Sequence, residues 1–481
     1  MNLRKILLSL AAGSIAFSGA AAQAQSISLL RDAEIEKFID EYARPIFRAA
    51  GLNEDSIEIV IVNDGTFNAF AGGRYMGVNS GLLTTVDTPN QMEAVIAHEA
   101  GHLAGGHSAR SQDAINKAGR SMILGLVLAG AAIAAGAPEA SMAALGFGQQ
   151  VGLANYLRYS RGQEATADQS SVTYLDRLGH SSKGALEVWR KMRNSQIIRS
   201  QQIVPYYQSH PLANERLTAL QQRAEASPYY DVKDSPQSIE RLKYIQAKIR
   251  GFLHDPVSTL RYYPLTDQSG PAHYGRAVAY YRTSQMDKAL DEIRTLTAAQ
   301  PENPYFHELE GQMLFEFGRS DEAIEPHRLS VKYLPDNALL RINLGRALLG
   351  SLDPANREKA VEEFKRALLL EPDNGFGWFE LARAYGELGD EPMALLATAE
   401  SRYHAGAEPA ANQFARRAIT RLKSGTPEWR RAADIIRVTQ PEGESLPLPE
   451  ASTESVPGPE TIPGRDNKRP EVPDPIPGGA K

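Results

Sequence analysis

The chain of 481 residues contains no cysteine. That absence excludes disulfide bridges, thiolate metal sites and lipid attachment through a cysteine. An excess of basic charge is also missing, because the formal net charge is −6 at pH 7 and a nucleic-acid partner would call for a basic surface. We therefore expect a modestly acidic protein without covalent cross-links and with no nucleic-acid partner.

An apolar run of membrane-spanning length is lacking in the middle of the chain as well. Residues 122–137 are uncharged and rich in Ala, Gly, Leu and Ile, but they number 16, whereas a spanning helix needs about 20. We expect this segment to pack within or on the folded domain. Peripheral contact with a membrane, or with an unfolded membrane-protein client, is the alternative.

The first 24 residues predict a cleavable secretory signal. Arg4 and Lys5 precede a short apolar core over residues 6–17, and A-Q-A at residues 22–24 has the small residues that cleavage requires. The core is too short to favour an uncleaved anchor, which is the alternative. We expect an exported protein whose mature chain begins at Gln25.

A short motif, H-E-A-G-H, begins at His98 and matches the helical zinc-peptidase pattern H-E-x-x-H. On a helix, His98 and His102 lie on one face, so both imidazoles can reach one metal ion. Glu99 lies beside them, where a carboxylate can take a proton from a coordinated water. A helix start at residues 88–91 and a glycine stop at residues 105–106 favour a helix between them.

Sequence spacing alone does not identify the third protein ligand of the metal ion. A metzincin would have histidine at position 108, where this chain has serine, and the nearby His107 is out of register. A site of two histidines and one glutamate leaves the fourth position for water, and Glu164 is the candidate. Glu164 and Asp168 lie four residues apart on an expected helix, so one can bind the metal while the other orients a ligand histidine. A solvated helix charge is the alternative for Glu164.

These residues resemble the HtpX-type zinc peptidases, a family with CAAX-prenyl peptidases and mitochondrial and periplasmic members. The resemblance rests on H-E-x-x-H, S-R-x-x-E-x-x-A-D at residues 160–168, N-A-F-A with G-V-N-S-G-L-L within residues 68–83, and S-H-P with an arginine within residues 209–216. It implies one zinc ion per chain, with Glu99 as general base and Asp168 as the residue that orients a ligand histidine. The implied metal ligands are His98, His102 and Glu164.

The same resemblance gives His210 a role. In periplasmic members of the family the matching histidine reaches the zinc and takes the place of the water, which implies a latent enzyme that is released when the His210 segment moves. Stabilisation of an oxyanion is a second alternative, and a structural histidine before a proline is a third. Removing a histidine that occupies the place of the water would raise activity, whereas removing an oxyanion donor would lower it.

The second half of the chain repeats itself with a period near 34 residues, and prolines close each unit. The period and the residue types are those of tetratricopeptide repeats. Some spacings are 37 residues and have separate sources, one of which is three extra residues within 352–359. Such arrays form grooves that bind peptides or partner proteins. Two series of small residues mark the expected helix crossings: Ala277, Gly311, Gly345 and Ala382, and Ala289, Ala323, Ala360 and Ala394.

We therefore predict an α+β, mainly helical protein. A zinc metallopeptidase domain with a small β-sheet and hairpin is expected at residues 25–232, and an all-α tetratricopeptide solenoid at residues 233–440. Within the first domain we expect a strand at residues 56–62 and a hairpin at residues 70–78. Residues 441–481 contain ten prolines and few apolar residues, so this tail is expected to be disordered.

Two functions remain open from the sequence. The first is a periplasmic zinc endopeptidase. Periplasmic family members with a C-terminal repeat array imply unfolded or misassembled outer-membrane proteins as clients and docking on the barrel-assembly machinery, with peripheral outer-membrane association left open. The second is a chaperone or assembly factor that binds such clients through its repeats with little or no proteolysis. The intact Glu99 favours the enzyme, because a pure scaffold has no need of it.

Overall fold

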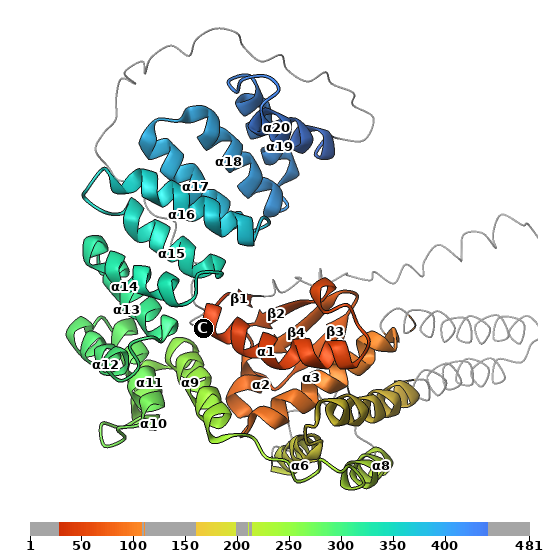
Figure 1. Cartoon of the computed structure of the whole chain (residues 1–481). Helices are drawn as coiled ribbons and strands as arrows, with labels where there is room; N and C mark the ends of the chain where they lie inside the picture. The colour runs from red at the N-terminus through yellow and green to blue at the C-terminus, as the bar shows by residue number, and fades with distance from the viewer. Residues whose placement is uncertain (1–27, 108–109, 111–159, 199–209, 211–213, 441–481) are drawn as a thin grey trace, which may run out of the picture.

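The computed structural model describes residues 28–107, 110, 160–198, 210 and 214–440. The expected signal at residues 1–24, the apolar stretch at 122–137 and the proline-rich tail at 441–481 lie outside the described residues. A small sheet with surrounding helices is followed by a long run of helical hairpins (Figure 1). The α+β, mainly helical fold class is confirmed.

A four-stranded sheet with the strand order β1-β2-β4-β3 forms one layer of the N-terminal half. β2 and β4 are parallel, and the other two pairs are antiparallel. The expected hairpin is β3 with β4, and it turns at Gly73, whose φ of +60° lies in the left-handed region that glycine adopts without strain. The expected strand starts two residues late, because residues 54–56 form a short 3-10 helix. The strands are β1 (Leu29–Leu30), β2 (Glu58–Val62), β3 (Ala69–Gly72) and β4 (Tyr75–Asn79).

Helices α1 (Ala33–Ala49) and α3 (Pro89–Ala104) contact each other and the sheet. A short helix, α2 (Ser80–Thr85), links β4 to α3, and α6 (Lys183–Ile198) packs on α3 and on α8 (Asn214–Glu225). One apolar core joins these layers, so α3 is held in a fixed place below the sheet. Its fully buried members include Phe38 of α1, Met76 of β4 and Leu186 of α6.

α3 is the helix that the H-E-x-x-H motif predicts. The Thr88 side chain caps its N-terminus by accepting a hydrogen bond from the backbone N–H of Gln91, and Pro89 occupies the first turn. The Gln91 side chain reaches back to the backbone N–H of Asp87 at 2.9 Å, so the reciprocal bond of a capping box is shifted by one residue. The helix ends at Ala104, and Gly106 follows with a left-handed φ of +57°.

The second half is a stack of helical hairpins that follow one another along an arc (Figure 1). At Gly311 an added Cβ would lie 2.8 Å from the His327 ring, and at Gly345 it would lie 2.5 Å from the Phe364 ring. Glycine therefore allows the two helices of each hairpin to cross closely, as the tetratricopeptide pattern predicts. The paired helices are α11 (Gly270–Arg282) with α12 (Met286–Ala299), α13 (Pro304–Glu316) with α14 (Ser320–Tyr333), α15 (Ala338–Leu349) with α16 (Asn356–Leu370), and α17 (Gly375–Leu388) with α18 (Glu391–His404).

Further helices flank the repeats on both sides. α9 (Pro236–Leu253) and α10 (Pro256–Tyr262) precede them, and α19 (Glu408–Ile419) and α20 (Pro427–Val438) follow them. The extra residues at 352–359 fall in the turn between α15 and α16 and at the start of α16. α9 is shared, because Ile245 joins the core around the sheet while Tyr244 and Ala247 join the core of the first hairpins.

A buried ion cluster reinforces this junction. The Lys248 side chain of α9 is 2% exposed, and its Nζ lies 2.8 Å from Asp32 and 3.2 Å from Glu34 at the start of α1. It also lies 3.7 Å from Glu308 of α13. The Tyr274 hydroxyl of α11 donates a hydrogen bond to Glu34 at 2.7 Å. Carboxylates from the sheet domain and from one repeat therefore surround one ammonium group, and a second repeat contributes the neutral Tyr274 hydroxyl.

Candidate metal centre

α3 directs three polar side chains into the protein interior. His98 and His102 lie one helical turn apart, with their Nε2 atoms 3.1 Å from each other. Glu99 follows His98 and is 1% exposed. The neighbouring Val95 and Ile96 are buried in the apolar core, so the polar groups lie in a low dielectric where electrostatic contacts are strong.

A second helix, over residues 160–178, brings Glu164 against α3. The two helices approach closely at Gly101, where an added Cβ would lie 3.0 Å from the Ala167 Cα. This approach places the Glu164 carboxylate oxygens 3.4 Å from the Nε2 of His98 and 3.4 Å from the Nε2 of His102. Glu164, rather than Asp168, is thus the acidic residue that faces both imidazoles.

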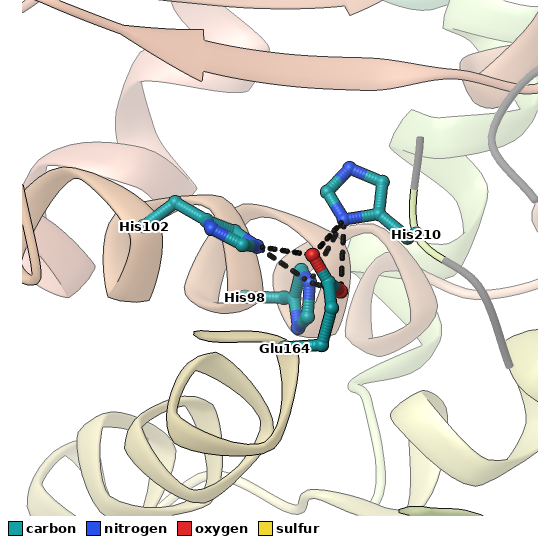
Figure 2. A group of neighbouring side chains, drawn as sticks. All are labelled: His98, His102, Glu164 and His210. Atoms are coloured by element: carbon teal, nitrogen blue, oxygen red, sulfur yellow. Dashed lines mark hydrogen bonds and ion pairs between the residues drawn. The ribbon is translucent and has the colours of Figure 1, made fainter. Parts of the chain in front are cut away.

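His210 completes the group from a separate segment of the chain (Figure 2). Its Nδ1 lies 3.3 Å from the Nε2 of His98 and 3.1 Å from Glu164 Oε2. The neighbouring Ser209 and Pro211 of the S-H-P motif lie outside the described residues. One donor atom from each of His98, His102, Glu164 and His210 lies within 4.8 Å of the others, and all four side chains are buried.

The spacing of these donors fits a four-coordinate metal ion. A tetrahedral site with metal–ligand bonds of about 2.1 Å has donor atoms separated by about 3.4 Å. With Glu164 Oε2 as its donor atom, four of the donor–donor distances in this group are between 3.1 and 3.4 Å. Three imidazoles and one carboxylate are also donors that first-row metal ions accept readily.

The outer nitrogen of His98 faces a carboxylate. His98 Nδ1 lies 3.0 Å from Asp168 Oδ1, one turn beyond Glu164 on the same helix. Arg216 of α8 holds Asp168 through two hydrogen bonds of 2.8 and 3.0 Å and lies 3.1 Å from Glu164. The Arg216 guanidinium also stacks over the Trp189 ring at 5.3 Å. Each carboxylate therefore has a partner that fixes its orientation.

The outer nitrogen of His102 faces a third histidine. His107 Nδ1 lies 2.9 Å from His102 Nδ1, and the two rings meet edge to face with their centroids 4.9 Å apart. The His107 side chain is buried as well. His107 is therefore placed behind His102, as Asp168 is placed behind His98, and outside the group of four donors.

Charges in the site shift the acid–base properties of its members. Burial would lower the pKa of His98, but hydrogen bonds to Asp168 and Glu164 outweigh it and raise that pKa to about 10. Burial and the adjacent His98 charge lower the pKa of His102 to about 2. Burial opposes ionisation of Glu164, yet hydrogen bonds from His210 and His98 hold its pKa below the usual value. These shifts keep Glu164 anionic and His102 neutral, and they favour a second proton on His98 between Asp168 and Glu164, which a metal ion would displace from Nε2 on binding.

Glu99 lies beside the group of donors. Its Oε1 is 3.4 Å from the Nε2 of His210, the ring nitrogen that points away from the other donors. A carboxylate in this place can exchange a proton with a molecule bound where His210 lies. Glu99 therefore has the location of a general base.

The structure brings together all six residues singled out from the sequence. His98, His102, Glu164 and His210 form the group of donors, with Glu99 and Asp168 adjacent to it. The sequence did not single out Trp189, and it left the contacts of Arg216 and His107 undefined. No pattern in the α6 sequence marks Trp189, because its contact with Arg216 depends on how α6 and α8 pack.

Comparison with known proteins agrees with this geometry. The sequence model of peptidase family M48 matches residues 29–224, a range that contains every residue of the site. These residues are therefore similar to the peptidases of family M48. Within the described part of the chain, no helix combines the length and the apolar character that a membrane crossing requires.

Several curated relatives match both halves of the chain. The chain is 25% identical over 421 residues to the beta-barrel assembly-enhancing protease of Yersinia pestis, covering 84% of this chain and 83% of the relative. The corresponding protease of Escherichia coli is 25% identical over 413 residues, covering 83% and 82%. Protease HtpX of a Psychrobacter species is 44% identical over 64 residues, covering 12% of this chain and 21% of the relative. Two solved MamA chains match with TM-scores of 0.27 and 0.30, too low to bear on the fold.

Proposed function

We propose that this chain is an M48-type, zinc-dependent endopeptidase of the periplasm that hydrolyses peptide bonds in misfolded or stalled outer-membrane proteins. The buried group of His98, His102, Glu164 and His210 carries the proposal. We propose zinc, one ion per chain, because zinc favours tetrahedral sites built from imidazole and carboxylate ligands.

The proposed mechanism assigns one task to each residue. Bound zinc would lower the pKa of a coordinated water and polarise the scissile carbonyl. Glu99 takes the proton from the attacking water and passes it to the leaving amine. Asp168 accepts a hydrogen bond from His98 Nδ1, which leaves the Nε2 lone pair of His98 for the metal.

His210 is proposed to gate the activity. Its Nδ1 lies among the donors, at 3.3 Å from His98 Nε2 and 3.1 Å from Glu164 Oε2, where a water would otherwise bind. Its Nε2 lies 3.4 Å from Glu99, so the same ring covers the proposed base. A substrate then binds only after the His210 segment has moved. Stabilisation of an oxyanion after that movement is the second role considered for His210.

Degradation of an unfolded test protein by the mature chain from Gln25 tests the proposal. We expect low activity in the wild type, higher activity in His210→Ala, and loss of that activity by roughly 100-fold or more in His210→Ala/Glu99→Gln with zinc retained. Turnover by the double variant would exclude Glu99 as the base. A His210→Ala variant slower than the wild type would favour the oxyanion role.

The proposed location rests on the expected signal, and the proposed partners rest on the names of the relatives. The signal expected at residues 1–24 supports export to the periplasm, and peripheral contact with the outer membrane is compatible with it. Relatives that match both halves are named for enhancing β-barrel assembly, so we propose unfolded or misassembled outer-membrane proteins as clients and the barrel-assembly machinery as a partner. The repeat array offers the surface for such contacts.

A second function is favoured by the length of the repeat array and by the position of His210. A chain whose metal site is covered at rest can act as a chaperone or assembly factor with little or no proteolysis. The Glu99→Gln variant separates the two functions in cells. If it supports outer-membrane assembly as well as the wild type does, binding rather than hydrolysis is the main activity.

A further inference from the structure

His107 occupies a position that the proposed mechanism leaves unused. α3 ends at Ala104, and the left-handed Gly106 turns the chain back so that the next side chain points at the metal centre. An added Cβ at Gly105 would lie 2.3 Å from His107 Nε2, so the two glycines leave the space that the ring fills. The turn that ends α3 therefore places the His107 ring next to the His102 ring.

The contact between His107 and His102 restricts where their protons lie. The two Nδ1 atoms are 2.9 Å apart, and a hydrogen bond between them needs a proton on one and a lone pair on the other. His102 Nε2 faces the donors, 3.1 Å from His98 Nε2 and 3.4 Å from Glu164 Oε1, so that nitrogen must be unprotonated to bind a metal. The His102 proton then lies on Nδ1, and His107 Nδ1 is the acceptor.

We propose that His107 is a positioning residue that fixes the tautomer and the ring orientation of His102 for metal binding. This proposal rests on the metal site proposed above. His107 does for His102 what Asp168 does for His98, because a ligand imidazole usually donates its outer N–H to an acceptor. His107 itself carries its proton on Nε2.

The choice of a neutral acceptor has an electrostatic reason. Glu164, Glu99 and Asp168 already place three carboxyl groups in or beside the site. A fourth carboxylate behind His102 would add repulsion between buried charges. An imidazole orients His102 through the same hydrogen bond without adding negative charge, and its T-shaped contact with the His102 ring fills the space behind it.

The competing explanation is that His107 only fills space behind His102. Two substitutions distinguish this packing role from the positioning role. His107→Phe keeps a ring of similar shape but removes the acceptor nitrogen. His107→Gln gives up the ring but supplies a carbonyl acceptor. His307→Phe is the matched control, because His307 is a buried histidine of the repeat array that makes a 2.7 Å hydrogen bond to the Pro301 carbonyl, far from the site in sequence.

The experiment measures zinc affinity of the full mature chain by competition with a chelator, together with the visible spectrum of the cobalt-substituted protein. We expect His107→Phe to weaken zinc binding by about 10- to 100-fold and to alter the cobalt spectrum. His107→Gln should recover most of the affinity, and His307→Phe should match the wild type. Equal affinity in His107→Phe and the wild type would overturn the proposal, as would a His107→Gln variant no better than His107→Phe.

A second measurement needs no substitution. In zinc-loaded protein labelled with 15N-histidine, NMR reports which ring nitrogen of His107 carries the proton. Protonation on Nε2 supports the proposal, and protonation on Nδ1 overturns it. If the wild type binds no zinc at all, the proposed metal site itself fails, and this result is distinguishable from an unchanged affinity in His107→Phe.

Discussion

At the scale of single residues, Asp168 links Arg216 of α8 to His98 of α3. It accepts hydrogen bonds from Arg216 and lies 3.0 Å from the outer nitrogen of His98. Burial would raise the pKa of Asp168, but hydrogen bonds from His98 and Arg216 outweigh it and lower that pKa. Asp168 is thus an ionised acceptor that faces His98 from outside the group of four donors.

The change Asp168→Asn replaces this acceptor with a weaker one of the same shape. We expect zinc affinity to fall by about 10- to 100-fold, because the His98 ring loses the charge that fixes its tautomer. Chelator competition measures the change. Asp176→Asn is the control, since Asp176 lies two turns along the same helix and accepts a hydrogen bond from Ser227 instead. Unchanged affinity in Asp168→Asn would contradict the role given to Asp168.

At the scale of elements, the site depends on the crossing of α3 and the helix over residues 160–178. The crossing is tight because Gly101 faces the Ala167 backbone, with an added Cβ only 3.0 Å from the Ala167 Cα. Glycine within a helix costs conformational entropy, so its presence here has a packing reason. The helices must lie this close for Glu164 to reach both imidazoles.

Gly101→Val should force the two helices apart. We expect a loss of stability of about 1–3 kcal/mol from overpacking, and lower zinc content because Glu164 moves away from the histidines. Thermal unfolding and metal analysis measure the two effects. Gly162→Ala, on the second helix, is the control, because no atom of the described residues lies within 4 Å of an added Cβ there. A Gly101→Val variant as stable and as metal-rich as Gly162→Ala would show that the crossing is tolerant.

At the scale of the whole molecule, the two halves are joined through α9. One face of α9 belongs to the core around the sheet and another to the core of the first hairpins. Lys248 links the two halves through ion pairs. Its Nζ lies close to Asp32 and Glu34 at the start of α1 and within 3.7 Å of Glu308 of α13. The repeats and the domain around the sheet therefore share one continuous packed frame.

Lys248→Met should destabilise this junction strongly. The substitution leaves buried carboxylates without their cation, a change that typically costs about 3–5 kcal/mol. Chemical denaturation measures the loss, and limited proteolysis between the halves shows where it acts. Lys243→Met on the same helix is the control, because Lys243 is exposed. Equal stability of the two variants would mean that the cluster contributes little.

The same cluster predicts a dependence on pH. Burial raises the pKa of Glu308 to about 7, because the attraction of Lys248 is offset in part by Asp32 and Glu34. A folded pKa above the unfolded value means that protonation favours the folded state. The stabilisation is complete below about pH 4.5 and is lost as pH rises through about 7.

We therefore expect the wild type to lose stability relative to Glu308→Gln between pH 5 and pH 8, by on the order of 1–3 kcal/mol. Denaturant unfolding of both proteins across this range measures the difference. Glu302→Gln, at an exposed position of the neighbouring turn, should follow the wild type at every pH. A constant difference between Glu308→Gln and the wild type would contradict the raised pKa.

Local pattern predicted much of this molecule. The helix that carries His98 and His102 follows from its cap, its periodicity and its glycine stop. The hairpin of β3 and β4 and the stacked helical pairs follow from turn residues and from the repeat period. Local signals predicted less at the ends of elements, where β2 begins two residues later than expected and the Gln91 bond is shifted by one residue.

The sequence by itself determined that His98, Glu99 and His102 share one helical turn, because a period of 3.6 residues places them there whatever surrounds the helix. Only the tertiary structure decided that Glu164, rather than Asp168, faces both imidazoles, and that His210 lies 3.3 Å from a residue 112 positions earlier. It also decided the position of α9 between the two halves. Such contacts depend on how closely helices cross, and that distance is set by packing at sites such as Gly101, which no local period reveals.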